Sequence, residues 1–391
     1  MPINWTGYDN GIRALHADGG ALDNVLSALS ALQPYDRWFA IVFFSDAAID
    51  PDTLAQRLCA QCPGLEVTGC TTAGELTPAG ILDGDLLFIL FPRDTFTVSS
   101  LVIDDMAAGG MGGIAASVGA LRESHAAKTE GSDHDRAFAL CLIDGMSNAE
   151  EAVTAAIFWG LDDIPLIGGS AGDHMEFRKT FIIAEGRASS GRAVIHIMST
   201  ALPFQIFKSD NFIPSTQKLV VTASDPDRRI VYEFNAAPAA DEYAAAIGID
   251  PQSLTPLSFA SHPVVVRVGG EYFCRSIQKV NPDRSLSFFC AIDDGVVLTV
   301  ARAQGMVEST RNTLNDIAAR LGGIDVILGF DCILRRLDAQ NRQVFRGMSE
   351  LYRDNRVIGF GTYGEQYQSL HLNQTLTGIA FGKPGKAEVA P

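Results

Sequence analysis

Short apolar runs alternate with amphipathic stretches along most of the chain, and one arrangement of them occurs three times. In each copy an apolar run predicts a strand, a stretch with helical spacing follows, and a second short strand reaches a glycine turn. Asp50 followed by Pro51 is a typical start for the first of these helices. The expected first strands are Trp38–Phe44, Ala137–Ile143 and Asp325–Leu334, and the expected helices are Pro51–Cys62, Ala149–Trp159 and Ala339–Arg353.

The three turns share their chemistry as well as their position. Each contains glycine, small or hydroxyl residues, and a final glycine followed by an acid. A strand–helix–strand crossover makes its two strands parallel, so each turn lies at the carboxyl end of a strand, where open α/β sheets hold ligands. The alternative is that each turn only closes a hairpin. The ligand hypothesis assigns a pocket to Thr71, Gly74, Glu75, Ser170, Gly172, Asp173, Tyr363, Gly364, Glu365 and Asn373.

This pattern predicts an α/β (mixed α+β) protein of two domains, each with mixed β-sheets and flanking helices. Residues 1–36 form a peripheral lead-in, 37–229 the first domain, 230–382 the second domain and 383–391 a tail. The boundary follows Asp225-Pro-Asp227, where the strand pattern breaks. A β meander then opens the second domain, in four short runs parted by turn residues. The predicted runs are His262–Val268, Glu271–Ile277, Leu286–Cys290 and Val296–Ala301.

Composition narrows the function classes. The formal charge of −16 repels phosphate backbones and anionic lipid, so neither nucleic acid nor membrane is an expected partner. The chain has no apolar run of about 20 residues and does not start with a basic and then apolar leader, which favours the cytoplasm. Cys59 and Cys62 form a C-x-x-C near a helix end, and no second pair completes a zinc site.

The sequence gives less support to a catalytic function than to ligand binding. Gly168-Gly-Ser170-Ala-Gly172 matches the G-x-S-x-G nucleophile elbow of α/β-hydrolases, which would make Ser170 a nucleophile. The elbow needs a helix to begin at the serine, whereas the residues after Asp173 alternate toward another strand. The turn acids could form an acid/base set, but the capping of backbone amides within the turns is the more ordinary role. We therefore expect that the protein is not an enzyme.

The histidines are divided by their surroundings. His125 and His134 fall in a polar stretch, 124–135, that predicts a loop with solvated side chains. His174, His262 and His371 lie at predicted strand ends, where a pocket could use them. Ordinary hydrogen bonding is the competing interpretation for each.

The ordered set of motifs resembles the FIST proteins. Gly69-Cys-Thr-Thr-Ala-Gly-Glu75, Pro165–Asp173, and Gly359–Glu365 with Asn373-Gln-Thr375 carry the similarity, as does Tyr232-Glu-Phe-Asn before a helix ending in Ile-Gly. The resemblance spans about residues 37–382, with an N-terminal FIST domain followed by a C-terminal one. It implies sensing of a small ligand in signal transduction, usually without catalysis.

One branch of that family gives a finer expectation. The segment 262–277 and Tyr363-Gly-Glu-Gln-Tyr are similar to stand-alone bacterial FIST proteins that bind haem and sense nitric oxide. This resemblance implies haem b and a separate signalling partner, such as a histidine kinase or a cyclic-di-GMP enzyme. His262 is then the first candidate for the iron and His371 the second, with Arg267, Arg275 and Lys279 as propionate partners. The alternative is a FIST protein without haem that binds an amino-acid-like metabolite.

Overall fold

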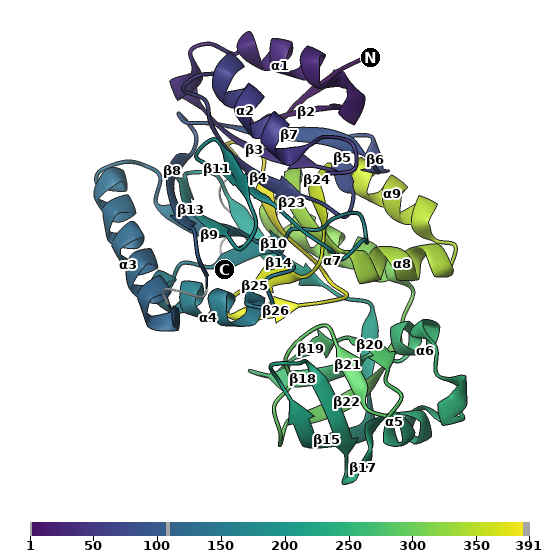
Figure 1. Cartoon of the computed structure of the whole chain (residues 1–391). Coiled ribbons are helices and arrows are strands. Elements are labelled where there is room, and N and C mark those ends of the chain that lie inside the picture. The colour runs from purple at the N-terminus through teal and green to yellow at the C-terminus, as the bar shows by residue number, and fades with distance from the viewer. Residues whose placement is uncertain (1, 107–109, 386–391) are drawn as a thin grey trace.

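The structure, a computed structural model, describes residues 2–106 and 110–385. It consists of a large body and a small domain that projects from one end of it (Figure 1). The body contains three similar units, so the repeated pattern in the sequence is confirmed as a repeated structure. The fold is mixed α+β, as predicted.

Each unit is built on a strand–helix–strand pair with parallel strands. β3 pairs with β4, β9 with β10 and β23 with β24, all in parallel. A later antiparallel strand of the same unit adds to the other side of each first strand. The first unit comprises β1 (Asn4–Gly7), β2 (Arg13–Asp18), α1 (Leu22–Ser30), β3 (Trp38–Phe44), α2 (Pro51–Gln61), β4 (Glu66–Thr71), β5 (Glu75–Thr77), β6 (Gly80–Leu82) and β7 (Asp85–Pro92).

The other two units repeat this order. The second comprises β8 (Thr97–Ile103), α3 (Gly110–Thr129), β9 (Arg136–Ile143), α4 (Glu150–Leu161), β10 (Leu166–Ser170), β11 (Ile182–Ala184), β12 (Arg187–Ser189) and β13 (Ala193–Thr200). The third comprises β14 (Phe204–Ser209), α7 (Met306–Leu321), β23 (Ile324–Cys332), α8 (Ile333–Asn341), α9 (Phe345–Asp354), β24 (Val357–Thr362), β25 (Glu365–Tyr367), β26 (Leu370–Leu372) and β27 (Leu376–Gly382).

The units exchange hairpins in a closed cycle. The β5–β6 hairpin of the first unit joins β24 of the third, β25–β26 of the third joins β10 of the second, and β11 of the second joins β4 of the first. The first and third glycine turns lead directly into the neighbouring sheet, whereas the second reaches it through the loop 171–181. The exchange therefore brings the three turns to a common centre.

The inner faces of the three sheets form one core. Phe43 stacks on Phe360 with ring centroids 4.4 Å apart, and Phe138 meets Phe381 edge-on at 5.8 Å. Helices cover the outer faces, with α1 and α2 on the first sheet, α3 and α4 on the second, and α7, α8 and α9 on the third. Burial of these apolar faces is the main stabilising term. In the part of the chain that is described, no helix is long and apolar enough to span a membrane.

The small domain is an insertion in the third unit, between β14 and α7. The four runs predicted as a meander form β18, β19, β21 and β22, but they do not pair in chain order. β21 pairs with β16 and β20, and β22 pairs with β15 and β18, so the predicted meander is wrong. The predicted boundary at 229/230 falls between β15 and β16, which pair with each other inside this domain. Its elements are β15 (Phe212–Asp225), β16 (Ile230–Phe234), β17 (Ala237–Pro238), α5 (Ala239–Ile247), α6 (Pro256–Ser261), β18 (Val264–Val268), β19 (Glu271–Arg275), β20 (Ile277–Val280), β21 (Leu286–Phe288) and β22 (Val297–Ala303).

The segment 1–36 was expected as a peripheral lead-in, but its described residues, 2–36, belong to the first unit. β2 pairs with β7 over its whole length, and Leu15 of β2 and Leu26 of α1 are fully buried. The strand is only six residues long and its four central residues are all buried, so it has no alternation that the sequence could reveal. Of the expected tail 383–391, positions 386–391 lie outside the described residues.

Candidate functional site

The three glycine turns meet through backbone hydrogen bonds. The amide of Ala73 donates to the carbonyl of Gly361 at 2.8 Å, that of Gly172 to Thr71 at 3.0 Å, and that of Ser170 to Gly364 at 2.8 Å. A Cβ atom at Gly172 would lie 2.8 Å from the Ala73 nitrogen, so only glycine permits this approach. We refer to this junction as the turn ring. The structure thus brings together the three turns whose residues were predicted to form a pocket.

Two acids of the turn ring are buried and bonded to threonines. Thr72 donates to Glu75 at 2.5 Å, and Thr375 donates to Glu365 at 2.6 Å. Burial raises the pKa of each glutamate from its ordinary value of 4.5 to about 8. Both acids are therefore largely protonated at neutral pH, and they support the turns from within rather than facing a ligand.

The third acid, Asp173, organises the loop that follows it. Its carboxylate accepts the amides of Phe177, Arg178 and Lys179 at 2.8, 2.6 and 2.9 Å, and it also accepts the hydroxyl of Tyr363. The Phe177 ring stacks on the Tyr363 ring at 4.5 Å. Two turns of the ring thereby hold an aromatic pair in place.

The loop after Asp173 carries backbone strain. His174, Met175 and Phe177 have φ values of 54°, 70° and 52°, in the left-handed region that side chains rarely adopt. Such conformations persist only when surrounding contacts impose them, and they concentrate at binding sites. Here the hydrogen bonds from the backbone amides to the Asp173 carboxylate impose these conformations.

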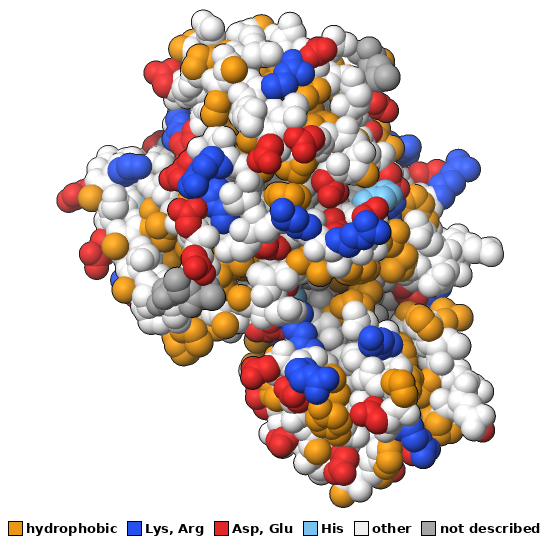
Figure 2. Space-filling model, in the orientation of Figure 1, with side chains coloured by type: hydrophobic (Ala, Val, Ile, Leu, Met, Phe, Trp, Pro, Cys, Tyr) orange, Lys and Arg blue, Asp and Glu red, His pale blue; other side chains and the backbone are white. Residues whose placement is uncertain are grey.

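A cleft of about 560 Å³ lies beside this loop, between the body and the small domain. The narrow junction of the two parts is visible in Figure 2. Tyr363 and Phe177 form part of its wall, so the turn ring reaches the cleft through the second and third turns. The other lining residues are Gly145, Met146, Asn148, Glu150, Arg228, Arg229, Ile230, Gln278, Lys279, Asn281, Ser287, Phe288, Phe289 and His371.

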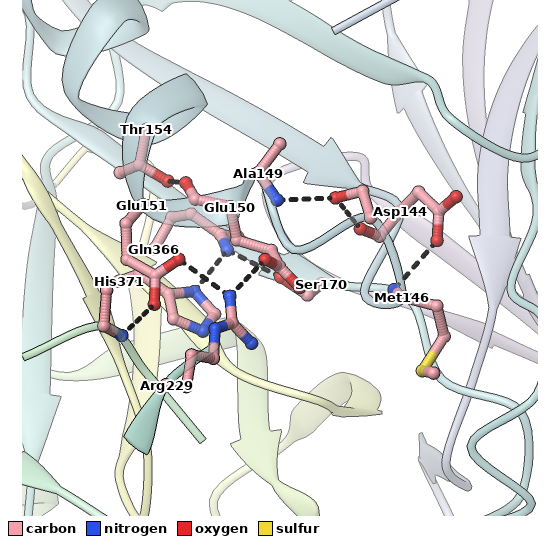
Figure 3. A network of polar contacts seen from close by, with 12 residues as sticks. Asp144, Met146, Ala149, Glu150, Glu151, Thr154, Ser170, Arg229, Gln366 and His371 are labelled. Carbon is pink, nitrogen blue, oxygen red and sulfur yellow. Dashed lines mark hydrogen bonds and ion pairs between the residues drawn. The ribbon is translucent and has the colours of Figure 1, made fainter. Parts of the chain in front are cut away.

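The charged residues of the cleft are mostly cationic. Arg229 is held by Glu150 at 2.8 Å and by Glu151 at 2.9 Å (Figure 3). Arg228 and Lys279 are exposed, and no ion pair joins either of them to another of the described side chains. Burial raises the pKa of Glu150 to about 7, against the opposing effect of Arg229. The cleft thus offers two exposed cations on a protein whose formal charge is −16, and one of them, Arg228, is also attracted to the nearby carboxylate of Asp283.

Ser170, Gln366 and His371 form a buried chain behind the cleft wall (Figure 3). The Gln366 amide donates to Ser170 Oγ at 2.8 Å and lies 3.2 Å from His371 Nδ1. Nδ1 then accepts, and the neutral imidazole carries its proton on Nε2. Burial lowers the pKa of His371 to about 4, so the ring is neutral at physiological pH. Ser170 is fully buried, which leaves no path for a substrate to reach its hydroxyl.

The remaining predicted ligands are spread over the small domain and its contacts. Arg275 donates to the carbonyl of His371 at 3.1 Å and so lies beside it. Arg267 lies over the Tyr272 ring at 5.8 Å. His262 follows α6, and its Nδ1 is buried with no hydrogen-bond partner among the described residues. Neither Arg267 nor His262 is among the described residues that line the cleft.

Two further predicted positions have distinct environments. His174 is partly exposed and its Nδ1 lies 4.0 Å from Asp83 Oδ1, outside the lining of the cleft. Asn373 is fully buried after β26, and neither its amide nitrogen nor its amide oxygen has a hydrogen-bond partner among the described residues. Asn373 is not among the described residues that line the cleft.

Several cleft residues were not expected from the sequence. Arg229 and Glu150 carry no motif, and each becomes relevant only because the small domain contacts α4. Phe177 offered one signal, since it is an aromatic residue close after a glycine turn that ends in an acid. Aromatic side chains next to such turns are reasonable candidates for a pocket wall.

The cleft does not fit haem well. It offers the imidazole of His371 and two cations for propionates, but much of its wall consists of charged and amide side chains rather than the apolar surface a macrocycle needs. Iron ligation through Nε2 would also require the His371 proton to move to Nδ1, and hence the Gln366 amide to turn over.

The fold and the cleft define a class of protein: a three-unit α/β body with an inserted small domain and a polar cleft between them. Residues 39–237 match the FIST N domain and residues 239–368 match the FIST C domain. The chain belongs to the FIST family, whose domains are associated with small-ligand sensing in signalling and are not typically catalytic.

Other comparisons add little. No curated protein matches the chain. The crystal structure of cyanuric acid hydrolase from A. caulinodans is similar at a TM-score of 0.38 and 8% sequence identity, over 95% of this chain and 99% of that one. Similarity at this level supports no inference about activity.

Proposed function

We propose that this chain is a cytoplasmic sensor that binds a small, anionic, amino-acid-like metabolite in the cleft and passes the signal to a separate protein. The observation that supports this most is the charge of the cleft. Arg228 and Lys279 present exposed cations that no ion pair joins to an acid among the described residues, although Asp283 lies near enough to Arg228 to attract it, on a strongly acidic chain. Unpaired cations at the wall of a concave site favour a carboxylate ligand.

The rest of the lining fits the other parts of such a ligand. Glu150 is able to accept a ligand ammonium, because its pKa near 7 leaves it partly ionised. Asn148 and Asn281 supply amide donors and acceptors, and the Phe177–Tyr363 stack gives an apolar surface for a short side chain. A few polar groups around an apolar wall are typical of metabolite sites.

Binding would be coupled to the packing of the small domain. A carboxylate at Arg228 and Lys279 adds negative charge beside Arg229, which already joins the small domain to Glu150 and Glu151 of α4. The ligand then competes with α4 for Arg229 and shifts the orientation of the small domain. A partner that contacts both parts would sense that shift.

Calorimetry tests the proposal. L-glutamate, L-aspartate and succinate are titrated into the wild-type protein and into the Arg228→Ala/Lys279→Ala variant. Each charge-assisted hydrogen bond lost costs about 1.5–3 kcal/mol, so we expect affinity to fall by at least about tenfold. Arg346→Ala is the matched control, because Arg346 is exposed on α9 outside the cleft. Equal affinity in all three proteins would refute the role of the cleft.

The family resemblance gives a finer version of the sensor, with haem b as cofactor, nitric oxide as the sensed gas, and a histidine kinase or cyclic-di-GMP enzyme as partner. His371 supplies its structural support, as a buried neutral imidazole on the cleft wall. Protein purified with haem supplied should then show a Soret band. Loss of that band in His262→Ala or in His371→Ala alone would identify the iron ligand.

The hydrolase alternative is tested through Ser170. The hydroxyl is fully buried and accepts from Gln366, which is a structural arrangement rather than that of an exposed nucleophile. We expect Ser170→Ala to leave any turnover of generic esters unchanged. A loss of turnover in a variant that still folds would restore the serine hydrolase interpretation.

A further inference from the structure

A second pocket, of about 610 Å³, opens where the first and second units meet. It is bounded by α2, β4, β8 and the turn after β11. The strand β11 pairs with β4 only through Ile182 and Ile183, and the chain then turns into β12, which packs toward α2. The edge of β4 from Glu66 to Thr68 is left facing this space. The pocket thus results from the exchange of hairpins, on the side of the body away from the small domain.

The wall of this pocket is mainly apolar. Its two charged residues, Glu66 and Glu185, already have arginine partners, Arg93 for the first and Arg187 and Arg192 for the second. A charged ligand therefore finds no unpaired opposite charge among the described lining residues. The apolar part consists of Ala55, Leu58, Cys59, Cys62, Pro63, Leu65, Val67, Val102, Ile183 and Ala184.

Two hydroxyls, those of Thr68 and Ser100, form the polar part of the wall, and His196 lies between them. His196 is fully buried, with Nε2 3.0 Å from Thr68 Oγ1 and Nδ1 2.9 Å from Ser100 Oγ. Ser100 donates its single hydrogen to Glu66 Oε1 at 2.8 Å. Ser100 must therefore accept from His196 Nδ1, and Nε2 of the neutral ring must accept from Thr68.

This direction of hydrogen bonds decides what the pocket can recognise. Thr68 has given its hydrogen to His196, and Ser100 has given its hydrogen to Glu66. Both oxygens are left with only lone pairs to offer. A ligand must bring a donor to them, because an acceptor such as a ketone, ether or carboxylate would meet oxygen against oxygen.

We propose that this pocket is a second ligand site, which binds a neutral apolar molecule ending in a hydroxyl group, an aliphatic alcohol or a phenol. The apolar wall takes the body of the ligand, and Thr68 Oγ1 accepts its hydroxyl hydrogen. The site is separate from the cleft and selects another kind of molecule, since the cleft offers cations and the two hydroxyls of this pocket offer only hydrogen-bond acceptors.

Cys59 provides a direct probe. Its thiol lines the pocket and is exposed, whereas the other six cysteines are buried, so iodoacetamide should alkylate Cys59 selectively in the folded protein. The test compares 2-naphthol with 2-methoxynaphthalene, which has a similar shape but no donor. We expect 2-naphthol to slow alkylation at a concentration about fivefold lower, the value of one neutral hydrogen bond. L-glutamate, a probe of the cleft, should not slow it.

Variants at Thr68 complete the test. Thr68→Val removes the acceptor and should make the two naphthalenes equally effective, while Thr68→Ser should keep the preference for 2-naphthol. If Thr68→Val fails to fold, the comparison of 2-naphthol with 2-methoxynaphthalene in the wild-type protein and in Thr68→Ser still tests the proposal. Failure of 2-naphthol to protect Cys59, or equal protection by the ether in the wild-type protein, would overturn the proposal.

Discussion

The guanidinium of Arg229, in the small domain, lies 2.8 Å from Glu150 Oε2 on the first turn of α4 in the body. Glu151 holds the same guanidinium at 2.9 Å and also accepts the amide of Ala291 at 3.1 Å. These contacts tie the inserted domain to the second unit beside the cleft. A ligand that changes the charge next to Arg229 therefore acts on the junction of the two parts.

Replacing Arg229 by alanine should destabilise the protein. Glu150 is almost fully buried, and without Arg229 it must either remain as a lone buried charge or take up a proton. Because its pKa is already near 7, protonation limits the loss to about 1–3 kcal/mol. Urea unfolding should show a loss that grows from about pH 6 to about pH 9. Adding Glu150→Gln should remove that growth, and a pH-independent loss would contradict the account.

The raised pKa values of Glu75 and Glu365 predict that the unfolding free energy falls as pH rises. Their folded pKa values of about 8 exceed the ordinary 4.5, so the folded protein binds protons that the unfolded chain releases. Their contribution is fully present below about pH 4.5 and is lost as pH rises through about 8. Glu75→Gln and Glu365→Gln should each reduce the fall in unfolding free energy, by up to about 1.4 kcal/mol per pH unit. Parallel wild-type and variant profiles would show that these acids are ionised in the fold.

Replacing glycine by alanine should have opposite effects on stability at Gly172, in the turn ring, and at Gly119, outside it. Gly172→Ala forces a methyl to 2.8 Å from the Ala73 nitrogen and should cost about 1–3 kcal/mol. Gly119→Ala, in the middle of α3, meets its nearest atom at 4.0 Å and should gain up to about 1 kcal/mol through helix propensity. Denaturation midpoints measure both. A neutral Gly172→Ala would mean that the turns do not meet as closely as described.

The aromatic pair should separate binding from folding. Phe177 is 41% exposed, so Phe177→Ala removes a contact with Tyr363 worth only about 0.5–1.5 kcal/mol of stability. If the pair forms the apolar wall for a ligand, the affinity for L-glutamate should fall while the fold persists. Phe177→Leu, which keeps an apolar surface, should retain most of the affinity. Unchanged binding in Phe177→Ala would place the ligand elsewhere.

The repeated unit could be predicted because it depends on local patterns. The parallel pairs of strands and the cap of α2, where Asp50 accepts the amide of Thr53 at 2.8 Å, follow from periodicity and turn chemistry. The exchange of hairpins could not be predicted, since the strands β5, β11 and β25 are only three residues long and their partners lie in other units. The convergence of the turns rests on that exchange.

The environment of His125 could not be predicted either, for the same reason. The stretch 124–135 was expected to be a loop with a solvated His125. Residues 130–135 do form a loop, but 124–129 continue α3, and the prediction for His125 is wrong. His125 lies in α3 and is buried between Ser99 at 2.9 Å and Ser199 at 2.8 Å, where burial lowers its pKa to about 4. Its partners come from β8 and β13, which are distant in sequence. Polar residues that pair across elements look the same in a sequence as polar residues that face water.

Hydrogen exchange, measured by mass spectrometry with the tightest binder among the standard amino acids and succinate, tests the central claim most directly. We predict that ligand slows exchange in the two halves of the cleft together, at residues 145–150 and 177 of the body and 278–289 of the small domain. The Arg228→Ala/Lys279→Ala variant should lose that protection. Failure of every tested compound to bind, or protection confined to other parts of the chain, would contradict the account.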